Sequence, residues 1–180
     1  GSFSTTDEVI ALAKVAARFG GVYDTHMRDE SSYSVGLLAS VEEVIRIAEG
    51  ADIPVHISHL KALGKDVWGQ SGDIIAMVDE ANERGLKVSA NQYPYRASGT
   101  RFSATLIPDW VRADSTARMF ERLENADLKD RIRAEMKENL RRRGGAEAML
   151  VTGAERQWRG MTLAEIAADL DDDELDAAIK

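Results

Sequence analysis

The sequence predicts an α/β fold in which three parallel strands alternate with helices over the first half of the 180-residue chain. Three observations lead to this prediction. Short apolar, β-branched runs recur at intervals that fit one strand, one helix and two loops. Amphipathic helical patterns lie between these runs. Each run ends in polar, chemically reactive residues, and α/β proteins place their sites where the carboxyl ends of parallel strands meet.

The first half of the chain is expected to contain three helices and three strands. The first helix should begin after Thr5, which has capping-box spacing with Glu8, and should end at Gly20-Gly21. Apolar residues at helical spacing predict two more helices. The expected ranges are 6–19, 35–49 and 73–84 for the helices, and 21–24, 55–58 and 86–92 for the strands.

The regular alternation ends after Tyr95, and the remaining residues predict a mainly helical region. We therefore divide the chain into residues 1–100, which carry the βα units, and residues 101–180, a helical insertion. The longest predicted helix has only a narrow apolar stripe, which is typical of a surface helix. The expected elements are a loop at 96–110, helices at 114–123 and 128–143, a short strand at 149–151, and two final helices from Leu163 onward.

Composition argues against several classes of protein. The net charge of −8 argues against nucleic-acid binding, which requires a basic face. No apolar run reaches the roughly 18–20 residues that a membrane helix needs, and no secretory signal pattern opens the sequence. Cysteine is absent, which excludes disulfides and thiolate metal ligands within the chain and fits a cytoplasmic location.

Two histidines stand at matching ends of neighbouring predicted strands. His26 follows the first run and His59 the second, so the two imidazoles can converge on one metal ion. Catalytic zinc sites use histidine and carboxylate ligands and keep one position open. On spacing alone, two ordinary hydrogen-bonded histidines remain the simpler interpretation. His56 is predicted to point away from the site, toward the helices, because strand residues alternate faces.

Other candidate side chains lie near the histidine pair in sequence. Lys61 follows the second strand and could hold a substrate carboxylate, although a loop lysine is more often only solvated. Tyr93 could donate a hydrogen bond to a developing oxyanion, or it could pack with its hydroxyl satisfied. Arg28 mirrors Lys61, but Asp29 and Glu30 are adjacent ion-pair partners for it.

The motifs at these strand ends resemble the N-acyl-D-amino-acid deacylases, or D-aminoacylases, of the amidohydrolase superfamily. The resemblance is strong over residues 3–100, including the opening at 3–8, and weaker in the helical region. Three linked motifs are more specific than any one of them, and they favour the metal role of the histidine pair. The motifs are Thr25-His26-Met27-Arg28-Asp29-Glu30, Ile57-Ser58-His59-Leu60-Lys61 and Tyr93-Pro94-Tyr95.

The resemblance implies a zinc-dependent (β/α)₈ barrel, a TIM-type fold, of which the chain would supply strands five to seven and a helical insertion. His26 and His59 would be metal ligands, with one or two zinc ions in a complete enzyme. Lys61, Tyr93 and, as a shifted match, Ser98 would contact the substrate.

Several parts of the family's site have no match in the sequence. The His-x-His pair after the first barrel strand and the bridging cysteine after the fourth are absent, and the general-base aspartate is expected beyond Lys180. No catalytic residue is therefore assigned within the chain, and the 180 residues alone are expected to be inactive. The family often has aspartate where Asn91 stands, which argues against a charged role there.

The resemblance implies that the parent protein hydrolyses the amide bond of N-acyl-D-amino acids, with a small-molecule substrate and no nucleic-acid or membrane partner. One alternative is hydrolysis of a cyclic amide, as in dihydroorotases or hydantoinases. The other is a non-catalytic structural or assembly module. A partial barrel also exposes sheet edges, so homo-oligomers formed through those edges are expected.

Overall fold

The structure is a computed structural model that describes residues 4–153 and 157–180. Phe3, which belongs to the opening motif, lies outside these ranges. The chain divides into two compact units, Gly1–Arg96 and Ala97–Lys180, and each unit has its own apolar core. Within the described ranges, no helix combines the length and the apolar character that crossing a membrane requires.

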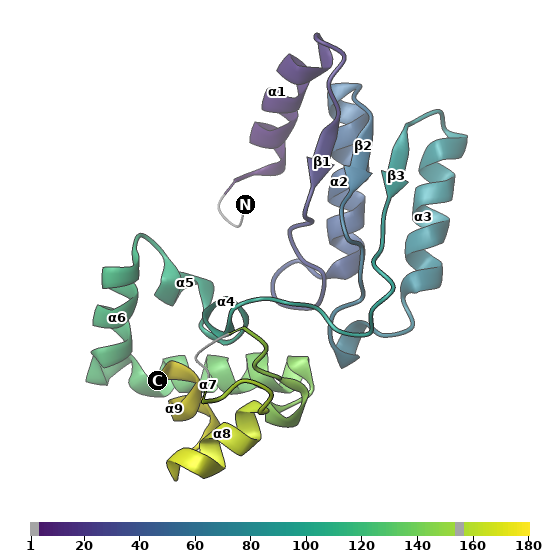
Figure 1. Ribbon diagram of the computed structural model, residues 1–180. Coiled ribbons are helices and arrows are strands. Elements are labelled where there is room, and N and C mark those ends of the chain that lie inside the picture. The colour runs from purple at the N-terminus through teal and green to yellow at the C-terminus, as the bar shows by residue number, and fades with distance from the viewer. Residues whose placement is uncertain (1–3, 154–156) are drawn as a thin grey trace. The chain divides into compact units, whose positions relative to one another are not determined.

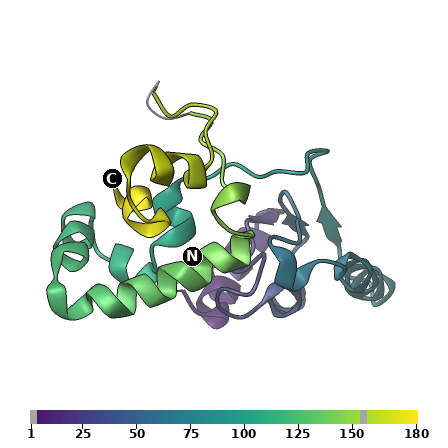
Figure 2. The ribbon, with the colours of Figure 1, turned by 90° about the horizontal axis from the view of Figure 1, so that it is seen from below.

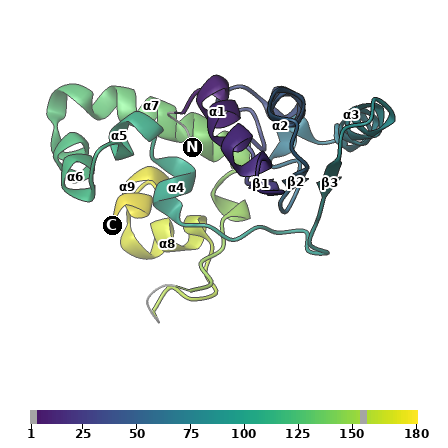
Figure 3. The same ribbon diagram turned by 90° about the horizontal axis from the view of Figure 1, so that it is seen from above.

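The first unit is a parallel sheet with helices along one face, and this α/β arrangement agrees with the prediction (Figure 1). The strands are β1 (Tyr23–Thr25), β2 (Val55–Ile57) and β3 (Val88–Ala90), in that spatial order. The helices are α1 (Thr6–Ala17), α2 (Leu37–Ala51) and α3 (Ser71–Glu83), with a 3₁₀ turn η1 (Lys65–Val67). Figure 3 shows the three α-helices on the same side of the row of strands. On the opposite face, the middle residues of the three strands are polar and lie side by side: Asp24, His56 and Ser89.

The residues of β2 show which face of the sheet the helices cover. Val55 and Ile57 are fully buried in the core that includes α2, and burial of such side chains stabilises a fold by about 1.5–3 kcal/mol each. His56 lies on the other face, where its Nδ1 contacts Ser89 Oγ at 2.9 Å. The prediction that His56 points toward the helices is therefore wrong. It assumed that His59 continues the alternation of the strand, but β2 ends at Ile57 and His59 has a left-handed φ of 43°.

Local capping explains where the first two helices begin. The Thr5 side chain accepts a hydrogen bond from the Glu8 amide at 3.2 Å, and the Glu8 carboxylate accepts one from the Thr5 amide at 2.7 Å. This is the predicted capping box of α1. α2 begins two residues later than predicted, at Leu37, because Gly36 has a φ of 89° and its amide donates to the buried Asp29 carboxylate.

The second unit is helical throughout most of residues 97–153 and 157–180. Its elements are α4 (Phe102–Leu106), α5 (Asp109–Arg112), α6 (Thr116–Glu124), α7 (Ala126–Arg143), η2 (Ala146–Ala148), α8 (Leu163–Leu170) and α9 (Glu174–Ile179). Figure 2 shows α7 as the long green helix of this unit. Its narrow apolar stripe, which consists of Ile132, Met136 and Leu140, is buried in the second core.

Two predictions for the second unit need correction. The expected loop at 96–110 contains α4 and the start of α5, because Leu106 and Ile107 are buried and draw the chain against the core. The expected strand at 149–151 is reduced to one antiparallel bridge between Leu150 and Thr162. Both errors concern short segments whose conformation depends on tertiary contacts rather than on a local pattern.

Candidate metal centre

His26 and His59 lie beside one another just past the carboxyl ends of β1 and β2. His26 directly follows β1, and His59 comes two residues after Ile57, the end of β2. His26 Nδ1 lies 3.2 Å from His59 Nε2, and the ring centroids are 4.8 Å apart. Two nitrogen ligands of a tetrahedral zinc ion, each about 2.0–2.1 Å from the metal, lie about 3.3 Å from each other. The separation of these two atoms therefore fits a shared ion.

Glu30 brings a carboxylate to the same place. Its Oε1 atom lies 3.1 Å from His59 Nδ1 and 3.5 Å from His26 Nδ1. All three side chains can present ligand atoms that lie within 4.8 Å of one another. Sequence reasoning considered Glu30 only as a partner for Arg28. The available signal was that Glu30 is the nearest glutamate after His26, in a loop that follows a strand.

The backbone at His59 is held in an uncommon conformation by Asn91. Few residues other than glycine adopt a positive φ such as the 43° of His59. The His59 amide donates to Asn91 Oδ1 at 2.5 Å, and the Leu60 amide donates to the Asn91 carbonyl at 2.9 Å. Asn91 also donates its own amide to the Ile57 carbonyl at 3.1 Å. The residue just past β3 thus shapes the turn that carries His59, a role that requires an acceptor oxygen and no charge.

Lys61 reaches the centre from the same turn. Its Nζ atom pairs with Glu30 Oε1 and lies 2.9 Å from His59 Nδ1. It also lies 5.7 Å from the centroid of the Tyr93 ring, which is within the range of a cation–π contact. Four of the five side chains predicted for the site, His26, His59, Lys61 and Tyr93, are therefore linked by a chain of direct contacts.

The fifth predicted side chain, Ser98, does not belong to the first unit. Ser98 is exposed and belongs to the second unit, in the irregular segment before α4. Its predicted contact with a substrate stays a prediction. Tyr95, by contrast, lies in the first unit, with its ring centroid 6.4 Å from that of Tyr93.

The electrostatic environment favours neutral imidazole at His26. Although much of this side chain is exposed, loss of hydration where the protein packs against it lowers the pKa of His26. The Glu30 charge opposes this change, and His59 and Lys61 lower the pKa of His26 further. Since a metal binds the neutral form of imidazole, a lowered pKa extends the pH range in which His26 can act as a ligand.

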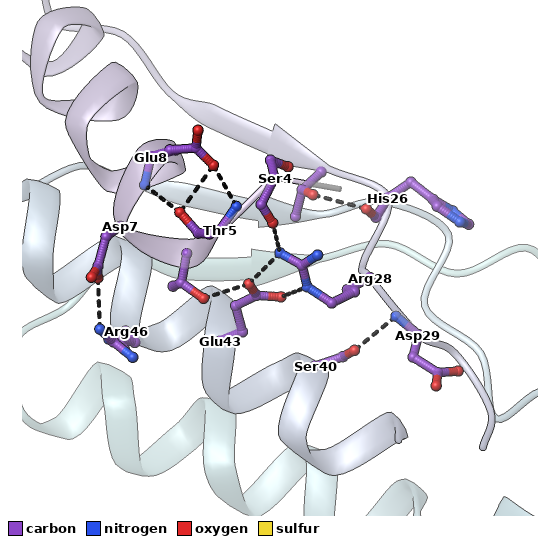
Figure 4. Close-up of polar contacts among 12 residues, drawn as sticks. Ser4, Thr5, Asp7, Glu8, His26, Arg28, Asp29, Ser40, Glu43 and Arg46 are labelled. Carbon is purple, nitrogen blue, oxygen red and sulfur yellow. Dashed lines mark hydrogen bonds and ion pairs between the residues drawn. The ribbon is translucent and has the colours of Figure 1, made fainter. Parts of the chain in front are cut away.

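Arg28 and Asp29 support the centre from behind instead of joining it (Figure 4). Arg28 forms a two-pronged ion pair with Glu43 of α2, with N–O distances of 2.7 and 2.8 Å, and donates to the Ser4 carbonyl. These hydrogen bonds raise the pKa of Arg28 and lower the pKa of Glu43. The Asp29 amide donates to Ser40 Oγ of α2 at 2.8 Å. Two consecutive residues just after the fully buried Met27 thus fix this segment to α2.

Comparison with known proteins identifies one group of relatives. No family model matches the chain. The chain is 38% identical over 97 residues to a D-aminoacylase of Alcaligenes xylosoxydans xylosoxydans. It is 32% identical over 114 residues to an N-acyl-D-glutamate deacylase of the same organism. The chain is thus similar in sequence to part of each of these deacylases. These alignments cover 54% and 63% of the chain, but only 19% and 22% of the two relatives.

Solved structures extend this likeness over nearly the whole chain. One is the N-acyl-D-glutamate deacylase from Bordetella bronchiseptica, complexed with zinc and a phosphonate that mimics the tetrahedral reaction intermediate. It matches with a TM-score of 0.69 and 26% identity, over 98% of this chain and 29% of that chain. A D-aminoacylase in complex with copper chloride matches with a TM-score of 0.63 and 27% identity, over 97% of this chain and 29% of that chain. The resemblance predicted from the three motifs is therefore confirmed.

Proposed function

We propose that this chain contributes the metal-binding edge of a zinc-dependent amidohydrolase that hydrolyses the amide bond of N-acyl-D-amino acids. The observation that carries the proposal is the convergence of His26, Glu30 and His59 past the carboxyl ends of parallel strands. It occurs in a chain that is related to D-aminoacylases in sequence and fold. The sheet would then be one arc of a (β/α)₈ barrel, a fold whose sites lie at this end of the strands.

The donor atoms of the centre fit zinc. Zinc binds imidazole nitrogen and carboxylate oxygen in tetrahedral sites, and catalytic sites leave one position open. His26 and His59 would hold the ion through Nδ1 and Nε2, the two atoms that already lie 3.2 Å apart. When bound, zinc supplies Lewis-acid polarisation of the scissile carbonyl and lowers the pKa of water.

Lys61 and Tyr93 are placed to recognise the acylated amino acid. The Lys61 ammonium, whose side chain is only 15% exposed, would neutralise the carboxylate of the substrate. The Tyr93 hydroxyl would donate a hydrogen bond to the oxygen that becomes negative during hydrolysis, and Ser98 would be a further contact. Hydrolysis then breaks the C–N bond, so that the acyl carbon gains hydroxide, the nitrogen gains a proton, and a free D-amino acid and a carboxylic acid are released.

A substrate panel tests this proposal. The longest native polypeptide that contains this sequence would be loaded with zinc and offered N-acyl-D-amino acids, the matching N-acyl-L-amino acids, and cyclic amides. We expect release of free amino acid from the D-series. Activity confined to cyclic amides would replace the proposed reaction with the alternative one, and a zinc-loaded protein inactive on the whole panel would favour a non-catalytic module.

Self-association through the sheet edges stays a prediction. In the part of the chain that the structure describes, β1 and β3 are the outer strands of the sheet. Leu12 and Val15 of α1 are exposed, as is Phe19 beyond the end of that helix. Unpaired edges and exposed apolar side chains favour association. Sedimentation of the chain over a range of concentrations would show whether oligomers form.

A further inference from the structure

The Asp29 carboxylate is buried at the start of the loop between β1 and α2, with only 3% of the residue exposed. Its Oδ1 atom accepts a hydrogen bond from the Ser31 amide at 2.8 Å. Its Oδ2 atom accepts from the amides of Ser34 and Gly36 at 2.5 and 3.1 Å, and from Ser34 Oγ at 3.2 Å. One carboxylate therefore holds the loop backbone at three amides, as far as the residue that precedes α2.

The hydrogen bonds to Asp29 require a carboxylate at this position. All four come from neutral N–H and O–H groups of the loop itself, and a buried carboxylate needs such donors to offset its loss of hydration. Asparagine has nearly the same shape, but it offers one acceptor oxygen and an NH₂ group that can only donate. In place of aspartate, its NH₂ group would face backbone N–H donors, and the loop would lose part of its support.

The residue enclosed by these hydrogen bonds is Glu30. The bond from the Ser31 amide to Asp29 Oδ1 closes a tight turn around it, a pattern that aspartate commonly forms with the amide two residues further on. On the other side of Glu30, the Asp29 amide donates to Ser40 Oγ of α2 at 2.8 Å (Figure 4). The backbone is therefore fixed before and after Glu30, which sets the direction in which this side chain leaves it.

Glu30 passes this constraint to the loop that follows β2. Its carbonyl accepts a hydrogen bond from the Leu63 amide at 2.8 Å, and its carboxylate pairs with Lys61 Nζ. Ser32 adds a further contact between the two loops, because its Oγ donates to Asp66 Oδ2 at 3.3 Å. The loop that carries Lys61 is thus held at three points against the loop after β1.

We propose that Asp29 is a positioning residue that places the Lys61 ammonium for the carboxylate of the substrate, by fixing the loop on which Glu30 lies. The inference rests on the proposed function and deepens it, because it adds a residue that sets the affinity for the substrate anion without touching the substrate. Without the Asp29 carboxylate, residues 30–36 lose their support and the Lys61 ammonium is no longer held in place.

The first measurement needs neither metal nor substrate. Hydrogen exchange of the Leu63 amide, followed by NMR, reports how firmly the two loops are joined. The Val55 amide, which donates to the Lys87 carbonyl within the sheet, corrects for any change in global stability. Relative to Val55, we expect protection of Leu63 to fall about tenfold or more in Asp29→Asn. It should not change in the matched control Glu43→Gln, which alters another largely buried carboxylate of the same unit.

The second measurement is the hydrolysis of N-acyl-D-amino acids by the longest native polypeptide that contains this sequence, loaded with zinc. We expect Asp29→Asn to raise KM about tenfold with a smaller change in kcat, because the substrate loses a charged partner in both the ground state and the transition state. A loss of folded protein alone would lower kcat and leave KM unchanged. Added to Lys61→Met, the same substitution should raise KM no further, since the group that Asp29 positions is already gone. Glu43→Gln should change neither constant.

The Ser34→Ala substitution keeps the inference testable if Asp29→Asn does not fold. It removes one of the four hydrogen bonds to the carboxylate, so the same changes are expected at about two- to threefold.

Three results would overturn the inference. The first is a Leu63 amide that keeps its protection relative to Val55 in the folded variant. The second is a lower kcat with an unchanged KM, and the third is a KM that rises by the same factor in the Lys61→Met background. A native polypeptide that hydrolyses no N-acyl-D-amino acid would contradict the proposed function instead, while exchange at Leu63 would still decide whether Asp29 fixes the loop.

Discussion

Two glutamate–cation pairs of the first unit differ in what surrounds them. Glu43 pairs with Arg28 through both of its oxygens, and its Oε1 also accepts from Thr6 at 2.7 Å, which leaves little capacity for a ligand. Glu30 uses one oxygen for Lys61 and two histidines. The first pair has the geometry of a structural clamp, whereas the second gathers groups that can bind a metal and a carboxylate. The comparison shows that burial and ion pairing alone do not distinguish a functional carboxylate from a structural one.

The Arg28→Ala substitution should give the largest loss of stability. It leaves the Glu43 carboxylate largely buried without its two-pronged partner, and breaking such a pair costs about 3 kcal/mol. Urea unfolding monitored by circular dichroism measures this loss. If the two pairs differ as we argue, Lys61→Met costs less stability than Arg28→Ala. Equal losses would contradict the distinction between clamp and site.

The pH dependence of stability should separate the two regions in the metal-free chain. Hydrogen bonds from Arg28 lower the folded-state pKa of Glu43 below 4.5, so its contribution is complete above that pH and is lost as the pH falls through the folded value. The pKa of His26 is lowered from 6.5, mainly by burial. The contribution of neutral His26 to stability is therefore present above pH 6.5 and is lost as the pH falls below that value, which is a higher pH range than for Glu43. The Glu43→Gln and His26→Ala substitutions should each remove one of these two losses of stability, which unfolding experiments over a range of pH would measure. A single step unaffected by both variants would contradict the assignment.

The His26→Ala and His59→Ala substitutions should each weaken zinc binding by about 100-fold or more, because the remaining ligands cannot complete a tetrahedral site. Titration calorimetry with zinc measures this directly. Arg28→Ala is the control for lost stability, since it should keep zinc affinity as long as the protein is folded. Zinc affinity that survives in both histidine variants would place the metal elsewhere.

The Asn91→Ala substitution should have a smaller effect than the histidine substitutions, and it should change both stability and zinc affinity. It removes the oxygen that accepts from the His59 amide, at a cost of about 1 kcal/mol in the free energy of unfolding. Because the turn at His59 then relaxes from its positive φ, zinc affinity should fall as well. Asn91→Asp keeps the acceptor and should keep both. A variant with unchanged zinc affinity would show that the turn does not depend on Asn91.

The smallest effect is expected for His56→Ala. His56 contacts Ser89 on the open face of the sheet, away from the helix-covered core. Removing it should change the free energy of unfolding by about 0.5 kcal/mol or less, and zinc affinity should not change. It is therefore the histidine control for the metal centre, and a loss of zinc affinity here would contradict the placement of the site.

The sequence was sufficient to predict those features that depend on local patterns. The capping box at Thr5, the helical apolar stripes and the three motifs predicted the βα units and brought His26, His59 and Lys61 to one edge of the sheet. The features that it did not predict depend on distant contacts. The side of His56 was missed because Asn91, which lies just past the end of β3, imposes the backbone turn at His59. The role of Glu30 was missed because a loop glutamate carries no periodic signal.

The most direct test of the account is a crystal structure of the zinc-loaded chain with anomalous diffraction at the zinc edge. We expect a zinc ion about 2.0–2.1 Å from both His26 Nδ1 and His59 Nε2, with the Glu30 carboxylate still beside His59 Nδ1. Zinc bound at His56 or at the acidic surface, with His26 and His59 unligated, would contradict it.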